Sequence, residues 1–165
     1  MVTEQELRAA VSSMVSTTLV NVVNWTTMID DRCVPATIGF FVELAGDHGM
    51  YDFYTLTVFS SLTKRACSLW VIRIGYIPVS DLVLAPERAL EQLSRSNENI
   101  AWALAHDLFR KPTVRLVRPG TFSDFLQLKL DEGSNTNSVG QVKVPIVLPK
   151  AEYVAWFSNR VVQEL

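Results

Sequence analysis

The sequence is poor in the residues from which proteins build disulfide frameworks, metal centres and phosphate-binding loops. It has two cysteines, two histidines and seven glycines among 165 residues. Cys33 and Cys67 cannot make a disulfide framework, and neither a C-x-x-C nor an H-E-x-x-H spacing occurs. The glycines are scattered, and no serine lies in a G-x-S-x-G context. We therefore expect no metal ion and no cofactor, and we assign no catalytic residue.

The sequence also has no large excess of one sign of charge and no long apolar run. The formal net charge is −2, which gives no overall attraction to nucleic acid or to an anionic membrane. Glu43, Asp52 and Arg73 interrupt the apolar runs well before they reach the length that spans a bilayer. A secretory signal begins with positive charges and continues with an apolar region. Here glutamates precede Arg8 and no such apolar region follows it. The sequence thus predicts a soluble, intracellular protein in the cytoplasm.

What the chain has in quantity is apolar material for a core. Hydrophobic residues make up 48% of the sequence, at the upper end of the usual range for a globular protein, and charged residues are somewhat sparse at 19%. We expect one domain over residues 1–165. Strand-like runs come in groups that are separated by short turn-forming segments. This grouping favours an α+β fold with an antiparallel sheet over a doubly wound parallel sheet.

Local patterns predict the individual elements. Thr3 and Glu6 have the spacing of a capping box, and Pro86 is a good first residue for a helix. Poor helix formers around Ser96 could break the second helix there. The β-branched residues from Thr17 onward disfavour a helix, so the second half of the first helix is ambiguous. We expect about six strands, at 34–45, 51–60, 67–77, 113–118, 122–131 and 139–148, and helices at 3–24, 86–110 and 149–164.

Three groups of residues are candidates for a functional site. Asp47, His48 and Asp52 could act in acid–base chemistry or bind a cation, although the same residue types are common at a hairpin tip. A basic stretch could contact an anion or an acidic partner, or could form a solvated face. Aromatic residues with an arginine could anchor an interface, or could widen the buried faces of the helices. The basic residues are Arg110, Lys111, Arg115 and Arg118, and the interface candidates are Trp102, Tyr153, Trp156 and Arg160.

The apolar excess, the amphipathic C-terminal segment and the missing catalytic motifs favour a function in binding. We expect a non-enzymatic interaction or assembly protein, oligomeric or part of a larger complex. A chaperone or adaptor, an immunity protein and a viral or phage structural component all fit this description. The alternatives are a small hydrolase or metal-dependent enzyme centred on Asp47, His48 and Asp52, and a nucleic-acid-binding protein that uses residues 110–118. A protein partner or self-association is thus expected, nucleic acid is less favoured, and no membrane contact is expected.

Overall fold

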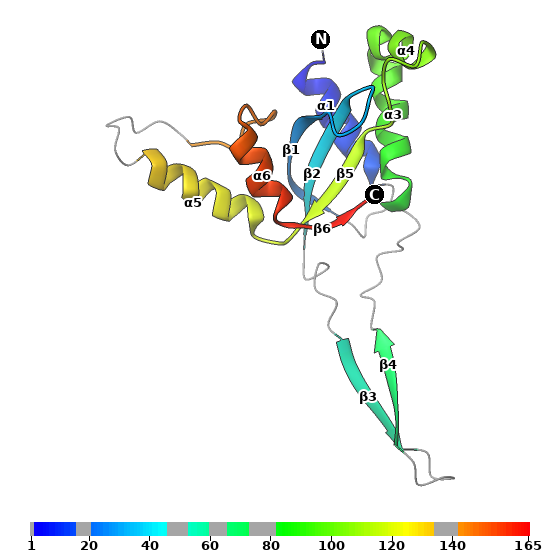
Figure 1. Cartoon of the computed structure of the whole chain (residues 1–165), viewed down its shortest axis with the longest axis vertical. Helices are drawn as coiled ribbons and strands as arrows, with labels where there is room; N and C mark the ends of the chain where they lie inside the picture. Colours follow the sequence, from blue (N-terminus) through cyan, green and yellow to red (C-terminus); the bar gives the residue numbers. More distant parts are fainter. Residues whose placement is uncertain (1, 16–20, 46–52, 60–65, 73–81, 134–141) are drawn as a thin grey trace.

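A four-stranded sheet organises the chain, and helices cover both of its faces (Figure 1). The computed structural model describes residues 2–15, 21–45, 53–59, 66–72, 82–133 and 142–165, with 53–59 and 66–72 described by their backbone. The described elements are α1 (Glu4–Met14), β1 (Val22–Asp30), β2 (Thr37–Leu44), β3 (Phe53–Phe59), β4 (Ala66–Ile72), α3 (Ala85–Ser96), α4 (Glu98–Ala105), β5 (Thr113–Val117), α5 (Thr121–Gly133), α6 (Ala151–Ser158) and β6 (Val161–Glu164).

The sheet is mixed, with the strand order β1-β2-β5-β6. β1 and β2 are antiparallel, β2 and β5 are parallel, and β5 and β6 are antiparallel. The parallel pair forms because α3 and α4 lie between β2 and β5 in the sequence, and parallel strands need such a long connection. β3 pairs with β4 in a separate two-stranded sheet and not with β2. The α+β class is therefore confirmed, whereas the antiparallel sheet of about six strands is wrong.

The first predicted helix is right in its first half and wrong in its second. Thr3 and Glu6 form the expected capping box, and α1 ends at Met14. From Val22 the chain is a strand, not the continuation of a helix to residue 24. The β-branched residues that made this segment ambiguous lose rotamer freedom in a helix and pack well in a sheet.

The central helix breaks where polar residues interrupt its apolar stripe. Asn97 ends α3, and its side chain accepts hydrogen bonds from the amides of Asn99 and Ile100 at the start of α4. Asn97 also donates to Glu6 Oε1 at 3.1 Å, which ties the break to the first turn of α1. A break near Ser96 is thus confirmed, and the helix predicted at 86–110 is two helices.

The segment predicted as a strand at 122–131 is the helix α5. Leu126, Leu128 and Leu130 alternate as they would in a strand, but Phe122 and Phe125 are the fully buried residues and lie one helical turn apart. The carboxylate of Glu43, at the end of β2, accepts hydrogen bonds from the backbone amides of Gly120 at 2.7 Å and Phe122 at 3.0 Å. This contact from a distant strand caps the helix and decides between the two patterns.

The last two predicted elements also differ from the structure. The described part of 139–148 forms no named strand, but Val147 bridges to Thr27 along the edge of β1. The Thr27 backbone donates to the Ile146 carbonyl and accepts from the Leu148 amide, each at 2.8 Å. The helix predicted at 149–164 ends at Ser158, and the chain then adds β6 to the other edge of the sheet.

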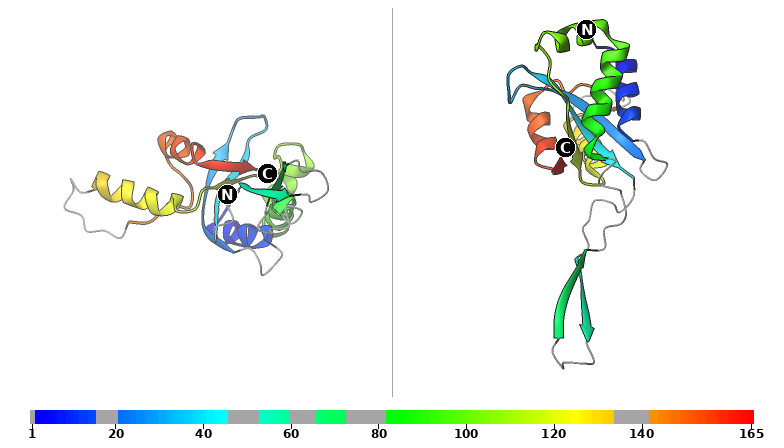
Figure 2. Two further views of the ribbon diagram at one scale, coloured as in Figure 1. Left: turned by 90° about the horizontal axis from the view of Figure 1, so that it is seen from below. Right: turned by 90° about the vertical axis from the view of Figure 1, so that its right-hand side faces the viewer.

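Helices lie on both faces of the sheet (Figure 2), and each face has its own hydrophobic core. The first packs α1, α3 and α4 against Phe40 of β2 and Val114 of β5. The second packs α5 and α6 against Phe41, whose ring centroid lies 5.3 Å from that of Phe157. Adjacent residues of β2 thus serve opposite cores, as the period of two in a strand requires.

Among the described residues, no helix is long and apolar enough to cross a membrane. The cytoplasmic location stays a prediction.

Candidate functional site

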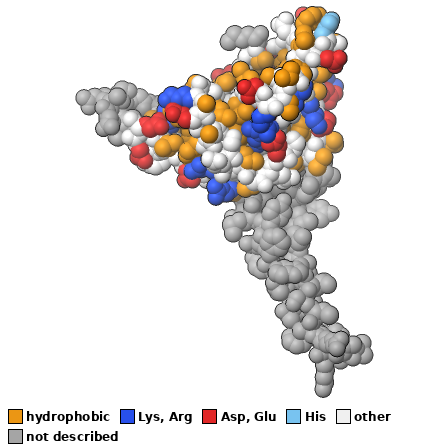
Figure 3. All heavy atoms as spheres, in the orientation of Figure 1, with side chains coloured by type: hydrophobic (Ala, Val, Ile, Leu, Met, Phe, Trp, Pro, Cys, Tyr) orange, Lys and Arg blue, Asp and Glu red, His pale blue; other side chains and the backbone are white. Residues whose placement is uncertain are grey.

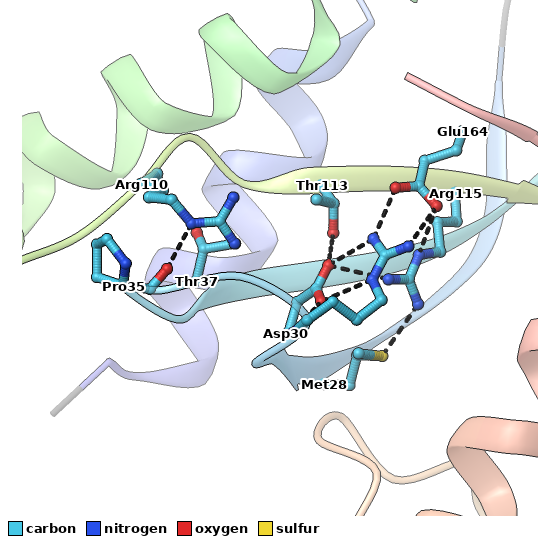
Figure 4. Close-up of polar contacts among 9 residues, drawn as sticks. Met28, Asp30, Pro35, Thr37, Arg110, Thr113, Arg115 and Glu164 are labelled. Carbon is cyan, nitrogen blue, oxygen red and sulfur yellow. Dashed lines mark hydrogen bonds and ion pairs between the residues drawn. The ribbon is translucent and has the colours of Figure 1, made fainter.

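A cluster of charged side chains extends from the end of β1 across β2 to β5 and β6 (Figure 4). Asp30 is the last residue of β1, Arg115 is central in β5, Glu164 is the last residue of β6, and Arg32 follows β1 in the loop. The strand register places Arg115 beside Phe41, on the same face as the aromatic core. We call Asp30, Arg32, Arg115 and Glu164 the charge cluster.

Arg115 is the centre of the charge cluster and is almost fully buried. Its Nη2 lies 2.9 Å from Asp30 Oδ2, and its Nε lies 3.1 Å from Glu164 Oε2. Its guanidinium also lies 5.4 Å from the ring centroid of Phe41, a cation–π distance. Because a buried arginine must be compensated, these contacts make Asp30 and Glu164 necessary partners.

Arg32 closes the cluster from the solvent side. Its Nη2 lies 2.8 Å from Asp30 Oδ2 and 2.6 Å from Glu164 Oε1, and its side chain is about half exposed. Two guanidinium groups thus face two carboxylates, and the formal charges of the cluster sum to zero. The pairing joins three strands and the loop after β1 through side chains as well as through the sheet.

The hydrogen bonds of the cluster fix its protonation state. Those from Arg32 hold the pKa of Asp30 far below its usual range, and the hydroxyl of Thr113 adds to this effect. Asp30 in turn raises the pKa of Arg32, and Arg32 lowers the pKa of Glu164. All of these shifts favour the charged forms, so around neutral pH these three groups hold position and do not exchange protons.

A glycine makes room for the cluster in β2. A Cβ atom on Gly39 would lie 3.1 Å from Met28 Cγ, 3.1 Å from Thr113 Oγ1 and 3.5 Å from Asp30 Cβ. The first two of these distances are shorter than packed side chains ordinarily show, so a side chain at residue 39 would press on Met28 and on Thr113, which donates to Asp30 at 2.7 Å.

The structure divides the predicted basic stretch. Arg115 is buried in the charge cluster, Lys111 pairs with Glu87 at 2.7 Å, and Arg110 donates through Nε to a backbone carbonyl. Arg118 is exposed. On the face seen in Figure 3, basic and acidic side chains lie interspersed. The four residues therefore do not form one anion-binding surface.

The predicted interface residues lie on opposite faces of the sheet. Trp102 is on α4 and is more than half exposed. Tyr153 is buried on α6, and its hydroxyl accepts a hydrogen bond from Lys129 Nζ at 2.6 Å. Trp156 packs against the second core, and the guanidinium of Arg160 lies 3.5 Å from its ring centroid. The four predicted interface residues therefore do not lie on one continuous surface of this chain.

The residues Asp47, His48 and Asp52 lie outside the described part of the chain. Among the residues that are described, no group of three or more His, Cys, Asp or Glu side chains gathers as a metal site would.

Sequence reasoning missed the charge cluster. The run Asp30-Asp31-Arg32 has the composition of a solvated turn, yet Asp30 is buried. The available signal was Arg115, a charged residue between Val114 and Leu116 in a strand, since a charge on a buried strand needs partners. That signal could not name the partners, because Asp30 and Glu164 lie 85 and 49 residues away.

No protein-family model matches the chain, and no curated protein matches it in sequence. Solved structures do match it. One is a GH3.15 acyl acid amido synthetase, with a TM-score of 0.67 and 17% identity over 98% of this chain and 25% of that chain. Another is the AtGH3.15 acyl acid amido synthetase in complex with 2,4-DB, with a TM-score of 0.69 and 18% identity over 98% of this chain and 24% of that chain. The chain thus spans about a quarter of the length of the structures it matches, and the likeness concerns the fold.

These matches contradict the prediction of a non-enzymatic assembly protein. The fold occurs as part of amide-forming enzymes, and nothing in the likeness indicates a chaperone, an immunity protein or a viral structural component. The predicted function in assembly is therefore wrong. The hydrolase alternative is centred on residues outside the described part of the chain, and it stays a prediction, as does the nucleic-acid alternative. A contact with a protein partner stays a prediction.

Proposed function

We propose that this chain forms one domain of an acyl acid amido synthetase, an enzyme that joins a carboxylic acid to an amine. One observation carries the proposal: the fold likeness takes in 98% of this chain but 25% of the enzyme it matches. Such a match supports a role as one domain of a larger catalytic unit. Because function resides in sites and not in folds, the activity has to be tested directly.

The charge cluster suits a positioning role in such a domain. An amide forms in water only after the carboxylate has been activated, and the activated group must be protected from hydrolysis. A domain that covers such a site has to present rigid elements to it. Ion pairs from Arg115 and Arg32 fix β6 against β5 and the end of β1. We assign to these residues the positioning of β6 and no proton transfer.

The test is a complementation assay that measures amide formation by mass spectrometry. The chain is mixed with the matched synthetase from which the corresponding quarter has been deleted, together with 2,4-DB, a panel of amino acids and a nucleoside triphosphate. We expect an amide product in the mixture and none with the deleted synthetase by itself.

Two variants serve as matched controls in that assay. Asp30→Ala removes the buried partner of Arg115, and Asp31→Ala changes the exposed neighbouring carboxylate. The first is expected to abolish complementation and the second to preserve it. A folded wild-type chain that gives no amide with any amino acid contradicts the proposal.

A further inference from the structure

The helix α4 presents an apolar face to solvent. Every residue from Ile100 to Ala105 is apolar, and a helix that is apolar all round is ordinarily buried. In α4, however, Ile100 is the buried residue, whereas Trp102 is 57% exposed. Leu108, just after the helix, is exposed to the same extent. At the upper right of Figure 3, over α4, apolar side chains are open to solvent next to acidic ones. Exposed apolar patches of this kind mark interaction surfaces.

Trp102 has the properties of an anchor residue. The ring of His106 stacks on its indole, with 4.2 Å between the ring centroids and 26° between the ring planes. His106 is itself restrained, because its Nδ1 lies 2.7 Å from the backbone oxygen of Trp102. A side chain that is ordered before binding loses little conformational entropy when a partner covers it. Tryptophan is also enriched among the few residues that supply most of the binding energy of an interface.

Acidic side chains border this face at both ends of α4. Glu98 lies in the first turn and Asp107 comes just after the helix, and neither forms an ion pair within the described part of the chain. A negative charge at the C-terminal end of a helix is unfavourable, so the stability of α4 does not explain Asp107. Arg95, in the last turn of α3, already pairs with Glu91 at 2.6 Å. The electrostatic complement of this face is therefore a surface with lysine or arginine beside apolar side chains.

We propose that the outer face of α4 docks a basic amphipathic helix of a partner protein. A helix fits this face because Ala101 and Ala105 are both exposed and lie one turn apart, so a second helix can approach closely. Trp102 packs against the apolar face of that helix, and its basic side chains pair with Glu98 and Asp107. The inference does not rest on the amide-forming activity, because α4 and the charge cluster lie on opposite faces of the sheet.

The experiment is a titration of the full, ¹⁵N-labelled chain with a synthetic peptide, followed by nuclear magnetic resonance. The peptide is an amphipathic helix of leucine, alanine and lysine, with about 18 residues so that it is helical by itself. The indole N–H of Trp102 is the reporter, and we expect it to shift and to saturate with a Kd of about 100 μM or tighter. A second peptide, with glutamate in place of each lysine, should bind about tenfold more weakly.

The chain offers a matched control for the apolar contact. Leu130 is 50% exposed, like Leu108, but lies on α5 at the other face of the sheet. We expect Trp102→Ala to weaken binding of the lysine peptide about tenfold and Leu108→Ala about fivefold, whereas Leu130→Ala should leave it unchanged. Calorimetry compares these variants, because Trp102→Ala removes the reporter. All three side chains are at least half exposed, so the variants should stay folded.

The acidic border has a control that changes the net charge equally. Glu98→Gln combined with Asp107→Asn should reduce the preference for the lysine peptide over the glutamate peptide to about twofold. Asp124→Asn combined with Glu152→Gln removes the same charge from exposed positions on α5 and α6, and it should leave the preference unchanged.

Three results would overturn the inference. One is the absence of a saturable shift of Trp102 at up to about 1 mM lysine peptide, a limit well above the expected Kd. Another is equal affinity for the two peptides, or the same effect of Leu108→Ala and Leu130→Ala on binding. The third is a chain that dimerises without peptide in light scattering and becomes monomeric with Trp102→Ala, because a second copy would then cover this face.

Discussion

The two faces of the four-stranded sheet are buried in different ways. On one face, α1 and α3 cover Phe40 and Val114 with side chains such as Leu93. On the other face, an aromatic core around Phe157 lies beside the buried charge cluster. The comparison teaches that an apolar core tolerates local variation, whereas the charged region depends on each of its partners.

The largest effect should come from removing a buried partner of the cluster. Asp30→Ala leaves the guanidinium of Arg115 buried beside one carboxylate where there were two. We expect the free energy of unfolding to fall by about 3–5 kcal/mol, as is typical when a buried pair loses one member. Denaturant unfolding measures the change. Asp31→Ala, at the exposed neighbouring carboxylate, should stay within about 0.5 kcal/mol of the wild type.

A smaller loss of stability is expected when the contact between β2 and the start of α5 is removed. Glu43→Ala removes the acceptor for the amides of Gly120 and Phe122 at the start of α5. The free energy of unfolding should fall by about 2–3 kcal/mol, because two amides lose a charged acceptor. Glu98→Ala, at an exposed position in the first turn of α4, should cost about 0.3–1 kcal/mol. Equal losses would show that the buried cap is not special.

The two faces should also differ in how pH affects the stability that they contribute. The pKa values of Asp30 and Glu164 are lowered on folding, so their contribution is full above about pH 4–5 and is lost as the pH falls through the folded values. Between pH 5 and 2 the wild type should lose on the order of 1–2 kcal/mol more than Asp30→Asn. Leu93→Ala, in the apolar core, should keep the wild-type slope. Unfolding curves across this pH range give the slopes.

The smallest effects are expected at the exposed ion pairs of α1 and α3. Glu4→Gln and Glu91→Gln each remove one i,i+4 partner of an exposed arginine. Each should lower the free energy of unfolding by about 0.3–0.5 kcal/mol, and less at high salt. Losses as large as that of Asp30→Ala would remove the distinction between buried and exposed pairs.

The sequence predicted best those elements whose signals are local. The capping box of Thr3 and Glu6, the helix start near Pro86 and the strand at 113–118 each depend on neighbouring residues, and each is confirmed. The segment 122–131 was wrong because leucines at alternate positions suit a strand, while the contact that selects a helix comes from Glu43, 79 residues from Phe122.

The charge cluster could not be predicted from local sequence patterns either, because its contacts also join residues that are far apart in the chain. Arg32 and Glu164 lie 132 residues apart in the chain and 2.6 Å apart in the fold. Their charges cancel within the cluster, so neither composition nor net charge indicates them. The parallel pairing of β2 and β5, which brings Arg115 beside Phe41, is also a property of topology and not of any single segment.

The central claim is that this chain works as one domain of an acyl acid amido synthetase. The most direct measurement is amide formation by a chimera in which this chain replaces the matching quarter of that enzyme within one polypeptide. We predict a 2,4-DB–amino acid adduct from the chimera and its loss in the same chimera with Asp30→Ala. A folded chimera that forms no amide, next to an active parent enzyme, would contradict the account.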